Sequence, residues 1–181
     1  DTFLIHNINQ MKIDVSCIET VVISHDHWDH TGGLWEILRR SRPAGLYGCP
    51  GFGGVFKNRV SGFPVKYFEA DSFTLVAYGI YSTGEVVGEY KGKNISEQAL
   101  IIKTEKGLSV VTGCSHPGII HILERVKSQL DVREFYSVLG GFHLKEQSSE
   151  DVAGIVKKFR ELNVKRAGPT LSSACMTLPS G

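Results

Sequence analysis

The alternation of apolar and polar positions in the first half of the chain predicts short strands, a helix and glycine-rich loops. Residues 20–24 form a continuous apolar run, which is typical of a strand buried on both faces. Apolar residues recur at helical spacing within 33–40, and a basic last turn followed by Pro43 predicts where that helix ends. Residues 50–54 and 84–94 are rich in glycine, so we predict surface loops there.

The second half of the chain shows the same mixture of strand-like and helical patterns. Residues 65–81 contain three strand-like runs, 65–68, 73–78 and 80–81, which we expect to pair as antiparallel neighbours. Two apolar runs on either side of Glu105–Gly107 predict a β-hairpin. The remaining expected elements are strands at 45–49, 134–139 and 164–167 and helices at 119–130 and 152–162, the latter opened by a capping signature at 148–151. The pattern predicts one α/β domain with mixed sheets.

Length, composition and charge argue against several classes of protein. The chain has 181 residues, 41% of them hydrophobic, and a formal net charge of +1, as in an ordinary soluble globular domain. The small charge without a basic run argues against a nucleic-acid binder, and no apolar run approaches the ~20 residues of a membrane helix. Four scattered cysteines without a Cys-x-x-Cys pair predict neither a zinc ribbon nor a disulfide framework, and they fit a cytoplasmic location. We therefore expect a small molecule as the binding partner.

The distribution of histidine is the most informative chemical feature of the chain. Three of the seven histidines lie within six residues, between the first predicted strand and the helix that follows it. His25 and His27 are two residues apart, so in an extended loop they face the same side and can chelate one metal ion. Asp29 and His30 follow at a spacing that can turn toward a second ion or support a metal-bound water. Hydrogen-bonded histidines in a polar loop are the alternative interpretation, but four ligand-type residues at this spacing favour a metal site.

A third imidazole for this site is expected from His116. It follows a predicted strand and precedes a predicted helix, in the same relation as the first cluster. With His25 and His27 it would complete a three-histidine site whose fourth position stays open for water, as in catalytic zinc centres. His143 also follows a predicted strand, and a contact to a metal ligand or to substrate fits its position as well as direct ligation does. Cys114 is a candidate soft ligand, although a small buried residue in a tight turn is the favoured interpretation.

Three segments of the chain resemble one family. Residues 25–30 read His-x-His-x-Asp-His and are followed by Thr-Gly-Gly-Leu, residues 112–118 read Thr-Gly-Cys-Ser-His-Pro-Gly, and residues 140–144 read Gly-Gly-Phe-His-Leu. The first segment is similar to the signature of the metallo-β-lactamase-fold superfamily. The other two resemble the branch of metal-dependent hydrolases related to 7,8-dihydropterin-6-methyl-4-(β-D-ribofuranosyl)aminobenzene-5'-phosphate synthase. The resemblance extends from about Asn7 to Pro169.

This resemblance implies a fold of the α/β (α+β) class, a four-layer αββα metallo-β-lactamase-like sandwich formed by one domain over residues 1–181. The family's first strands precede its histidine signature, and this chain begins too late to contain them, so we expect the domain to be incomplete at both ends. Leu171 stands where the branch has a histidine that binds a second metal. Cys114 stands where the superfamily commonly has a bridging aspartate. We therefore expect either a mononuclear centre or a second site with weakened affinity.

The leading functional hypothesis is metal-assisted hydrolysis of a small ester, lactam or phosphate substrate. His25, His27 and His116 would hold one Zn²⁺, with Mn²⁺ or Fe²⁺ as alternatives, and a water bound there would have a pKa near ~7. Asp29 would orient this water and act as general base. His30 would bind a second ion or stabilise the developing oxyanion. The full set of candidate metal ligands is His25, His27, Asp29, His30, His116 and His143.

Two alternatives come from other functional classes. The branch resemblance implies a synthase that transfers a pterin group, for which Lys91, Lys93 and Lys145 are candidate contacts to a departing diphosphate. Leu171 is also consistent with a non-catalytic metal-binding domain. A diiron oxygen-reducing centre is disfavoured, because such relatives resemble one another in carrying glutamate where this chain has His27.

Overall fold

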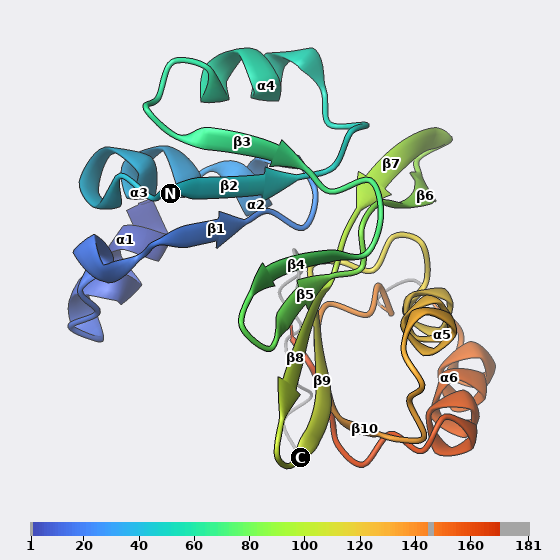
Figure 1. Cartoon of the computed structure of the whole chain (residues 1–181). Coiled ribbons are helices and arrows are strands. Elements are labelled where there is room, and N and C mark those ends of the chain that lie inside the picture. Colours follow the sequence, from blue (N-terminus) through green and yellow to red (C-terminus); the bar gives the residue numbers. More distant parts are fainter. Residues whose placement is uncertain (1, 145–146, 171–181) are drawn as a thin grey trace.

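The chain folds into two main sheets, each packed against helices (Figure 1). The computed structural model describes residues 2–144 and 147–170. The first sheet consists of three parallel strands, β1 (Thr20–Val22), β2 (Gly45–Gly48) and β3 (Lys66–Glu69), in that order. Parallel neighbours need crossover connections, and these contain α3 (Leu34–Ser41) and α4 (Gly54–Val60). The buried core on this side includes Ile23, Leu34, Trp35, Leu38, Leu46, Phe52, Phe56 and Val60.

The second sheet has six strands in the order β11-β10-β9-β8-β5-β4. Their bounds are β4 (Thr74–Ala77), β5 (Ile80–Ser82), β8 (Leu100–Thr104), β9 (Gly107–Thr112), β10 (Phe135–Gly140) and β11 (Ala167–Pro169). The strands β9, β10 and β11 are parallel, whereas β4, β5, β8 and β9 pair antiparallel. The helices α5 (Ile119–Gln129) and α6 (Ser149–Glu161) lie side by side against this sheet (Figure 1). A second buried cluster, which includes Ile101, Val110, Leu123 and Phe135, fills the space between them.

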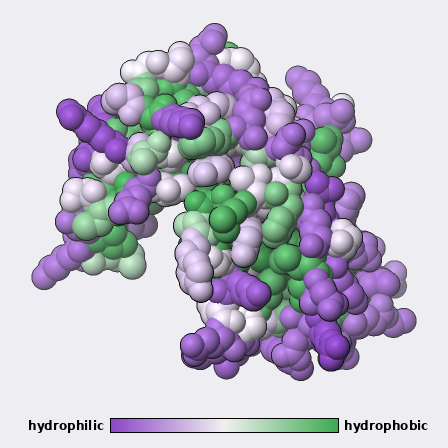
Figure 2. All heavy atoms as spheres, in the orientation of Figure 1, coloured by the Kyte–Doolittle hydropathy of each residue, from purple (hydrophilic) through white to green (hydrophobic). Residues whose placement is uncertain are grey.

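The order of helices, sheet, sheet and helices confirms the expected mixed α/β class and its αββα arrangement. Each core cluster joins one sheet to its own helices, and residues of both sheets line the space between them. Figure 2 shows this face of the molecule hollowed between the two halves, with apolar residues at the head of the hollow. Among the described residues, no helix has the length and apolar content to cross a membrane.

Three short helical segments surround β1. They are α1 (Thr2–Gln10), the 3-10 helix η1 (Val15–Cys17) and α2 (Trp28–Thr31). Leu4 of α1 rests on the backbone at Gly33, where an added Cβ would collide with the leucine side chain. The glycine before α3 therefore lets α1 pack directly on the turn that follows the histidine cluster.

The segment predicted as a surface loop at 84–94 is instead part of a hairpin. The strands β6 (Val86–Tyr90) and β7 (Lys93–Glu97) form a two-stranded antiparallel sheet of their own. Lys91 and Gly92 at the turn both have positive φ, 51° and 73°, which is the conformation of a two-residue hairpin turn. The prediction was wrong because the first turn position holds lysine, whereas asparagine, aspartate or glycine is the usual signal for a turn with positive φ.

The loop predicted at 50–54 is confirmed for residues 50–53, and the helix α4 begins at Gly54. Two other expectations are corrected by the structure. The run at 65–68 forms β3, which pairs in parallel with β2 and not with β4 or β5. β1 is only half-buried, because it lies at the edge of its three-stranded sheet instead of between two strands.

Other elements form where the pattern of apolar and polar residues predicts them. The β8–β9 hairpin forms around Glu105–Gly107. Ser148 caps α6: its hydroxyl accepts a hydrogen bond from the N–H of Asp151, and the Asp151 carboxylate accepts one in return from the Ser148 N–H. Local capping chemistry therefore sets the beginning of this helix.

Candidate metal centre

The first ligand loop begins where β1 ends. The chain turns through residues 24–27, and the short helix α2 then begins at Trp28. His27 has an extended backbone at the N-terminus of α2, and its carbonyl accepts hydrogen bonds from the N–H groups of the last two residues of that helix. His27, with its extended backbone, and His30, within the helix, belong to two different groups of converging ligand atoms.

The second ligand loop, residues 113–118, joins β9 to α5. It packs closely on the first loop, since a side chain at Gly113 would collide with the Ser24 hydroxyl. Ser115 and Gly118 both have positive φ, 60° and 92°, which lets the loop reverse sharply. This reversal brings His116 against the first ligand loop.

The structure brings His25, His27 and His116 together as the sequence predicts. Their ligand atoms lie within 4.8 Å of one another. The ring centroid of His25 lies 4.8 Å from that of His27 and 5.0 Å from that of His116, and the rings meet edge to face. Among the described residues, His25 Nε2 and both ring nitrogens of His116 are buried without a hydrogen-bond partner. A buried polar atom without a partner is unfavourable, and a metal ion would satisfy His25 Nε2 and one of the two His116 nitrogens, so the residues present fit the metal that the family resemblance implies.

Burial also places these imidazoles in the form that binds metal. The pKa of His25 is lowered to about 2, chiefly by burial and further by the nearby histidines. Burial lowers the pKa of His116 to about 4. Both rings are therefore neutral near pH 7, and neutral imidazole is the ligating species.

A second group of converging ligand atoms consists of His30, Cys114 and, again, His25. Cys114 Sγ lies 3.1 Å from His30 Nε2. Burial lowers the pKa of His30, while the carboxylate of Asp29 acts in the opposite direction. Cys114 is buried, as predicted, and its sulfur is one of the converging ligand atoms of this second group. A thiolate with imidazoles suits zinc or iron better than magnesium or calcium.

Asp29 and His143 lie at the edge of these groups. Asp29 is exposed, and its Oδ2 atom lies 3.7 Å from His30 Nε2. His143 is exposed, has a left-handed backbone with a φ of 52°, and places its ring centroid 4.9 Å from that of His116. Within the described ranges, neither residue belongs to a group of three converging ligand atoms. Leu171 lies outside the described residues.

The β6–β7 hairpin contributes an aromatic residue that sequence reasoning missed. The ring centroid of Tyr90 lies 5.0 Å from that of His27, 4.9 Å from that of His116 and 6.0 Å from that of His143. Tyr90 therefore covers the histidine cluster from the side of the second ligand loop. No local pattern indicates this role, because the contact depends on how the hairpin folds over the loop.

Two buried polar residues between β7 and β8 were also missed. Glu97 and Gln98 have almost no exposed surface. Burial raises the pKa of Glu97, and hydrogen bonds from backbone N–H groups of the second ligand loop oppose that effect. In the sequence this dipeptide resembles an ordinary polar connection before an apolar strand, so its burial depends on tertiary contacts alone.

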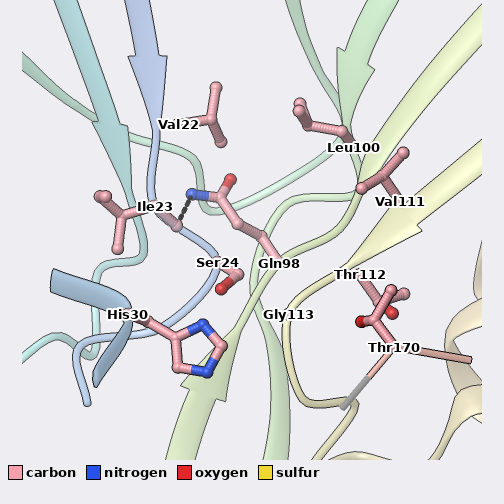
Figure 3. A pocket seen from close by; sticks show the side chains of 10 residues that line it. All are labelled: Val22, Ile23, Ser24, His30, Gln98, Leu100, Val111, Thr112, Gly113 and Thr170. Atoms are coloured by element: carbon pink, nitrogen blue, oxygen red, sulfur yellow. Dashed lines mark hydrogen bonds between the residues drawn. The ribbon is translucent and has the colours of Figure 1, made fainter. Parts of the chain in front are cut away.

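A cavity of about 380 Å³ lies beside His30, between the two sheets. Figure 3 shows Val22 and Leu100 on opposite sides of this space with Gln98 between them, whereas the side chain of Ile23 is directed away from it. Apolar side chains such as Val22, Leu100 and Val111 line the cavity together with polar residues, namely Ser24, His30, Gln98, Thr112 and Thr170. Small-molecule sites combine apolar walls with polar groups in this way. The cavity reaches the metal centre at His30.

The match to a known family agrees with this geometry. Residues 3–129 match the sequence model of the Metallo-beta-lactamase superfamily. Because the match covers more than half of the chain and includes both ligand loops, the chain belongs to the metallo-β-lactamase superfamily. The resemblance predicted from the histidine signature is confirmed.

Individual relatives support the branch that the other motifs indicate. The chain is 27% identical over 205 residues to the 7,8-dihydropterin-6-methyl-4-(beta-D-ribofuranosyl)-aminobenzene-5'-phosphate synthase of Methanocaldococcus jannaschii, covering 90% of this chain and 69% of that protein. It is 28% identical over 166 residues to the uncharacterized protein MJ0448 of the same organism, covering 77% and 63%. The crystal structure of Tm1679, a metal-dependent hydrolase of the beta-lactamase superfamily, is similar with a TM-score of 0.70 and 29% identity, covering 91% of this chain and 72% of that one.

Proposed function

We propose that the chain is a metal-dependent hydrolase that acts on a small ester, lactam or phosphate substrate. The observation that carries the proposal is the convergence of His25, His27 and His116, with three buried ring nitrogens that have no hydrogen-bond partner among the described residues. These residues would hold one divalent ion, with zinc preferred and Mn²⁺ or Fe²⁺ as alternatives. When bound, such an ion supplies Lewis acidity toward water and the substrate oxygen.

The residues around the three histidines supply proton transfer and charge stabilisation. Asp29 offers a partly exposed carboxylate beside His30, so it can accept a proton from the attacking water and release it to solvent. His30 would stabilise negative charge that develops on the substrate, or join Cys114 in a second metal position. His143, exposed beside His116, would contact the substrate or a ligand.

A second candidate, a synthase that transfers a pterin group, has its own support. The synthase of M. jannaschii aligns with 90% of this chain. At the tip of the β6–β7 hairpin, Lys91 Nζ lies 5.0 Å from the ring of Tyr90, which itself lies against the histidine cluster. A cation at this place would attract the phosphate groups of such a substrate. Lys93 is exposed on the same hairpin, whereas Lys145 lies outside the described residues.

Metal analysis of the purified chain and of two matched variants tests the metal centre. The wild-type chain is expected to bind at least one divalent ion, and His116→Ala is expected to lose the ion held by the three histidines. His121→Ala removes an exposed imidazole of α5 and should retain the wild-type metal content. Wild-type metal content in His116→Ala would contradict the proposed ligand set.

Activity assays then separate the functional classes. Turnover of an ester, lactam or phosphodiester by the metal-loaded chain supports the hydrolase. Condensation of a dihydropterin diphosphate with an aminobenzene ribofuranosyl phosphate supports the synthase. Stoichiometric metal without either activity would favour a non-catalytic metal-binding domain.

A further inference from the structure

The two ligand loops extend from different sheets. The first follows β1 of the three-stranded sheet, and the second follows β9 of the six-stranded sheet. The hydrogen bonds within either sheet therefore cannot set the separation of His25 from His116. The dipeptide formed by Glu97, the last residue of β7, and Gln98, which follows it, contacts both loops.

Gln98 holds the first ligand loop. Its backbone N–H donates to the carbonyl of Ser24 at 2.8 Å, and its side-chain Nε2 donates to the carbonyl of Ile23 at 2.8 Å (Figure 3). Its Oε1 atom accepts a hydrogen bond from the hydroxyl of Ser82, which fixes the amide orientation. These contacts are buried, so water does not compete for them.

Glu97 holds the second ligand loop. Its Oε1 atom accepts hydrogen bonds from the N–H groups of Cys114 at 2.9 Å and Ser115 at 2.8 Å, and its Oε2 atom accepts one from the N–H of His116 at 2.8 Å. The left-handed backbone of Ser115 turns successive N–H groups toward one point, the arrangement of an anion-binding nest. In this protein the anion is the chain's own carboxylate.

The same carboxylate also lies close to a candidate ligand of the first loop. Glu97 Oε1 is 4.0 Å from His25 Nδ1, while the unpartnered Nε2 is the opposite nitrogen of that ring. Ser24 Oγ lies 3.1 Å from the same Nδ1 atom. Polar groups behind a ligating imidazole orient its ring and increase its basicity toward a metal.

We propose that Glu97 and Gln98 act together as a bracket that holds the two ligand loops at the separation needed to bind one metal ion. Both are positioning residues, since neither belongs to the groups of converging ligand atoms found within the described ranges. The inference rests on the proposed metal centre and identifies what assembles it. It makes metal affinity depend on two residues that do not touch the metal.

The test compares metal dissociation constants of Glu97→Gln and Gln98→Met with that of the wild-type chain, using Co²⁺ and Zn²⁺ in competition with a chromophoric chelator. Glutamine at 97 keeps the shape but directs an NH₂ group at backbone N–H donors, so we expect affinity to fall ~10–100-fold. Methionine at 98 removes both amide contacts at nearly unchanged volume, and a fall of the same order is expected. Glu105→Gln makes the same chemical change as Glu97→Gln at an exposed hairpin turn and should bind metal like the wild type.

The absorption spectrum of the bound Co²⁺ and the melting temperature of the metal-free chain separate positioning from a merely structural role. If Glu97 and Gln98 position the two loops, Glu97→Gln and Gln98→Met should show an altered Co²⁺ spectrum and weaker metal binding while they still unfold cooperatively. A lower melting temperature with wild-type affinity and spectrum would overturn the inference, and if Glu97→Gln does not fold, Gln98→Met decides by the same criteria. His116→Ala separates failure of the bracket from failure of the metal centre. If His116→Ala loses the metal while Glu97→Gln and Gln98→Met bind it with wild-type affinity, the bracket alone is overturned. Unchanged metal binding in His116→Ala overturns the metal centre and the bracket with it.

Discussion

His25 shows how its surroundings prepare a single residue for metal binding. Burial and neighbouring histidines lower its pKa to about 2, whereas an unfolded histidine has a pKa of about 6.5. Between these values the unfolded chain binds a proton that the folded chain does not bind. Acid therefore favours the unfolded state: the stability contributed by the neutral ring is fully present above the unfolded pKa and is lost progressively as the pH falls toward the folded pKa.

This difference predicts how the stability of the metal-free protein depends on pH. We expect the free energy of unfolding to be highest above about pH 6.5 and to decrease as the pH falls toward about 4, because His25 and His116 both have lowered pKa values. Urea unfolding at a series of pH values measures the slope. His116→Gln should show a shallower decrease, and His121→Gln should follow the wild type. A wild-type stability that does not change over this range would contradict the prediction.

At the scale of elements, the β6–β7 hairpin is fitted to the second ligand loop through one glycine. A Cβ added at Gly88 would lie 2.5 Å from the backbone nitrogen of Pro117 and 2.6 Å from the carbonyl carbon of His116. These are backbone atoms, which cannot rotate away as a flexible side chain would. Only glycine therefore allows the hairpin to approach the loop closely enough for Tyr90 to contact the histidine rings.

We expect Gly88→Ala to move the hairpin and the second ligand loop apart. The loss of packing should lower the free energy of unfolding by ~1–3 kcal/mol and weaken metal binding, because the backbone of His116 must shift. Gly154→Ala is the matched control: it lies in α6 with no atom within 4 Å of the added Cβ, so it should raise stability by ~0.5–1 kcal/mol and leave metal affinity unchanged. Urea unfolding and metal titration measure both effects. Wild-type stability and affinity in Gly88→Ala would show that the close approach is not required.

At the scale of the whole molecule, the candidate metal centre lies where two separately packed halves meet. One core cluster joins the three-stranded sheet to α3 and α4, and the other joins the six-stranded sheet to α5 and α6. His25 and His27 belong to the first half and His116 to the second. A metal ion bound by all three would therefore link the halves and stabilise only the folded, assembled molecule.

Metal binding should consequently raise the stability of the entire chain. At a free metal concentration of ~100 times the dissociation constant, we expect an increase of ~2.7 kcal/mol in the free energy of unfolding. Thermal and urea unfolding with and without chelator measure this increase. His116→Ala should remove it, whereas His121→Ala should keep it. An equal increase in wild type and His116→Ala would mean that the metal stabilises the chain at another place.

The local parts of the site could be predicted because their chemistry is encoded by neighbouring residues. His25, His27 and His30 share one turn, and His116 repeats the same strand-to-helix position, so spacing alone indicates ligands. The contacts of Gln98 and Glu97 have no such signal, because Gln98 binds a carbonyl 75 positions away and Glu97 binds N–H groups 17 to 19 positions away.

The sequence by itself indicated the class of fold, the helices with clear apolar stripes and the histidines of both ligand loops, since the spacing of residue types within short segments carries each of these signals. Only the tertiary structure placed β3 in the first sheet, folded residues 86–97 into a hairpin over the histidines and set Cys114 beside His30. It also buried Glu97 and Gln98 between the two ligand loops. The physical reason is that a polar or glycine-rich segment has the same local conformational preferences whether it is exposed to solvent or buried. The segment that packs against it decides which of the two occurs.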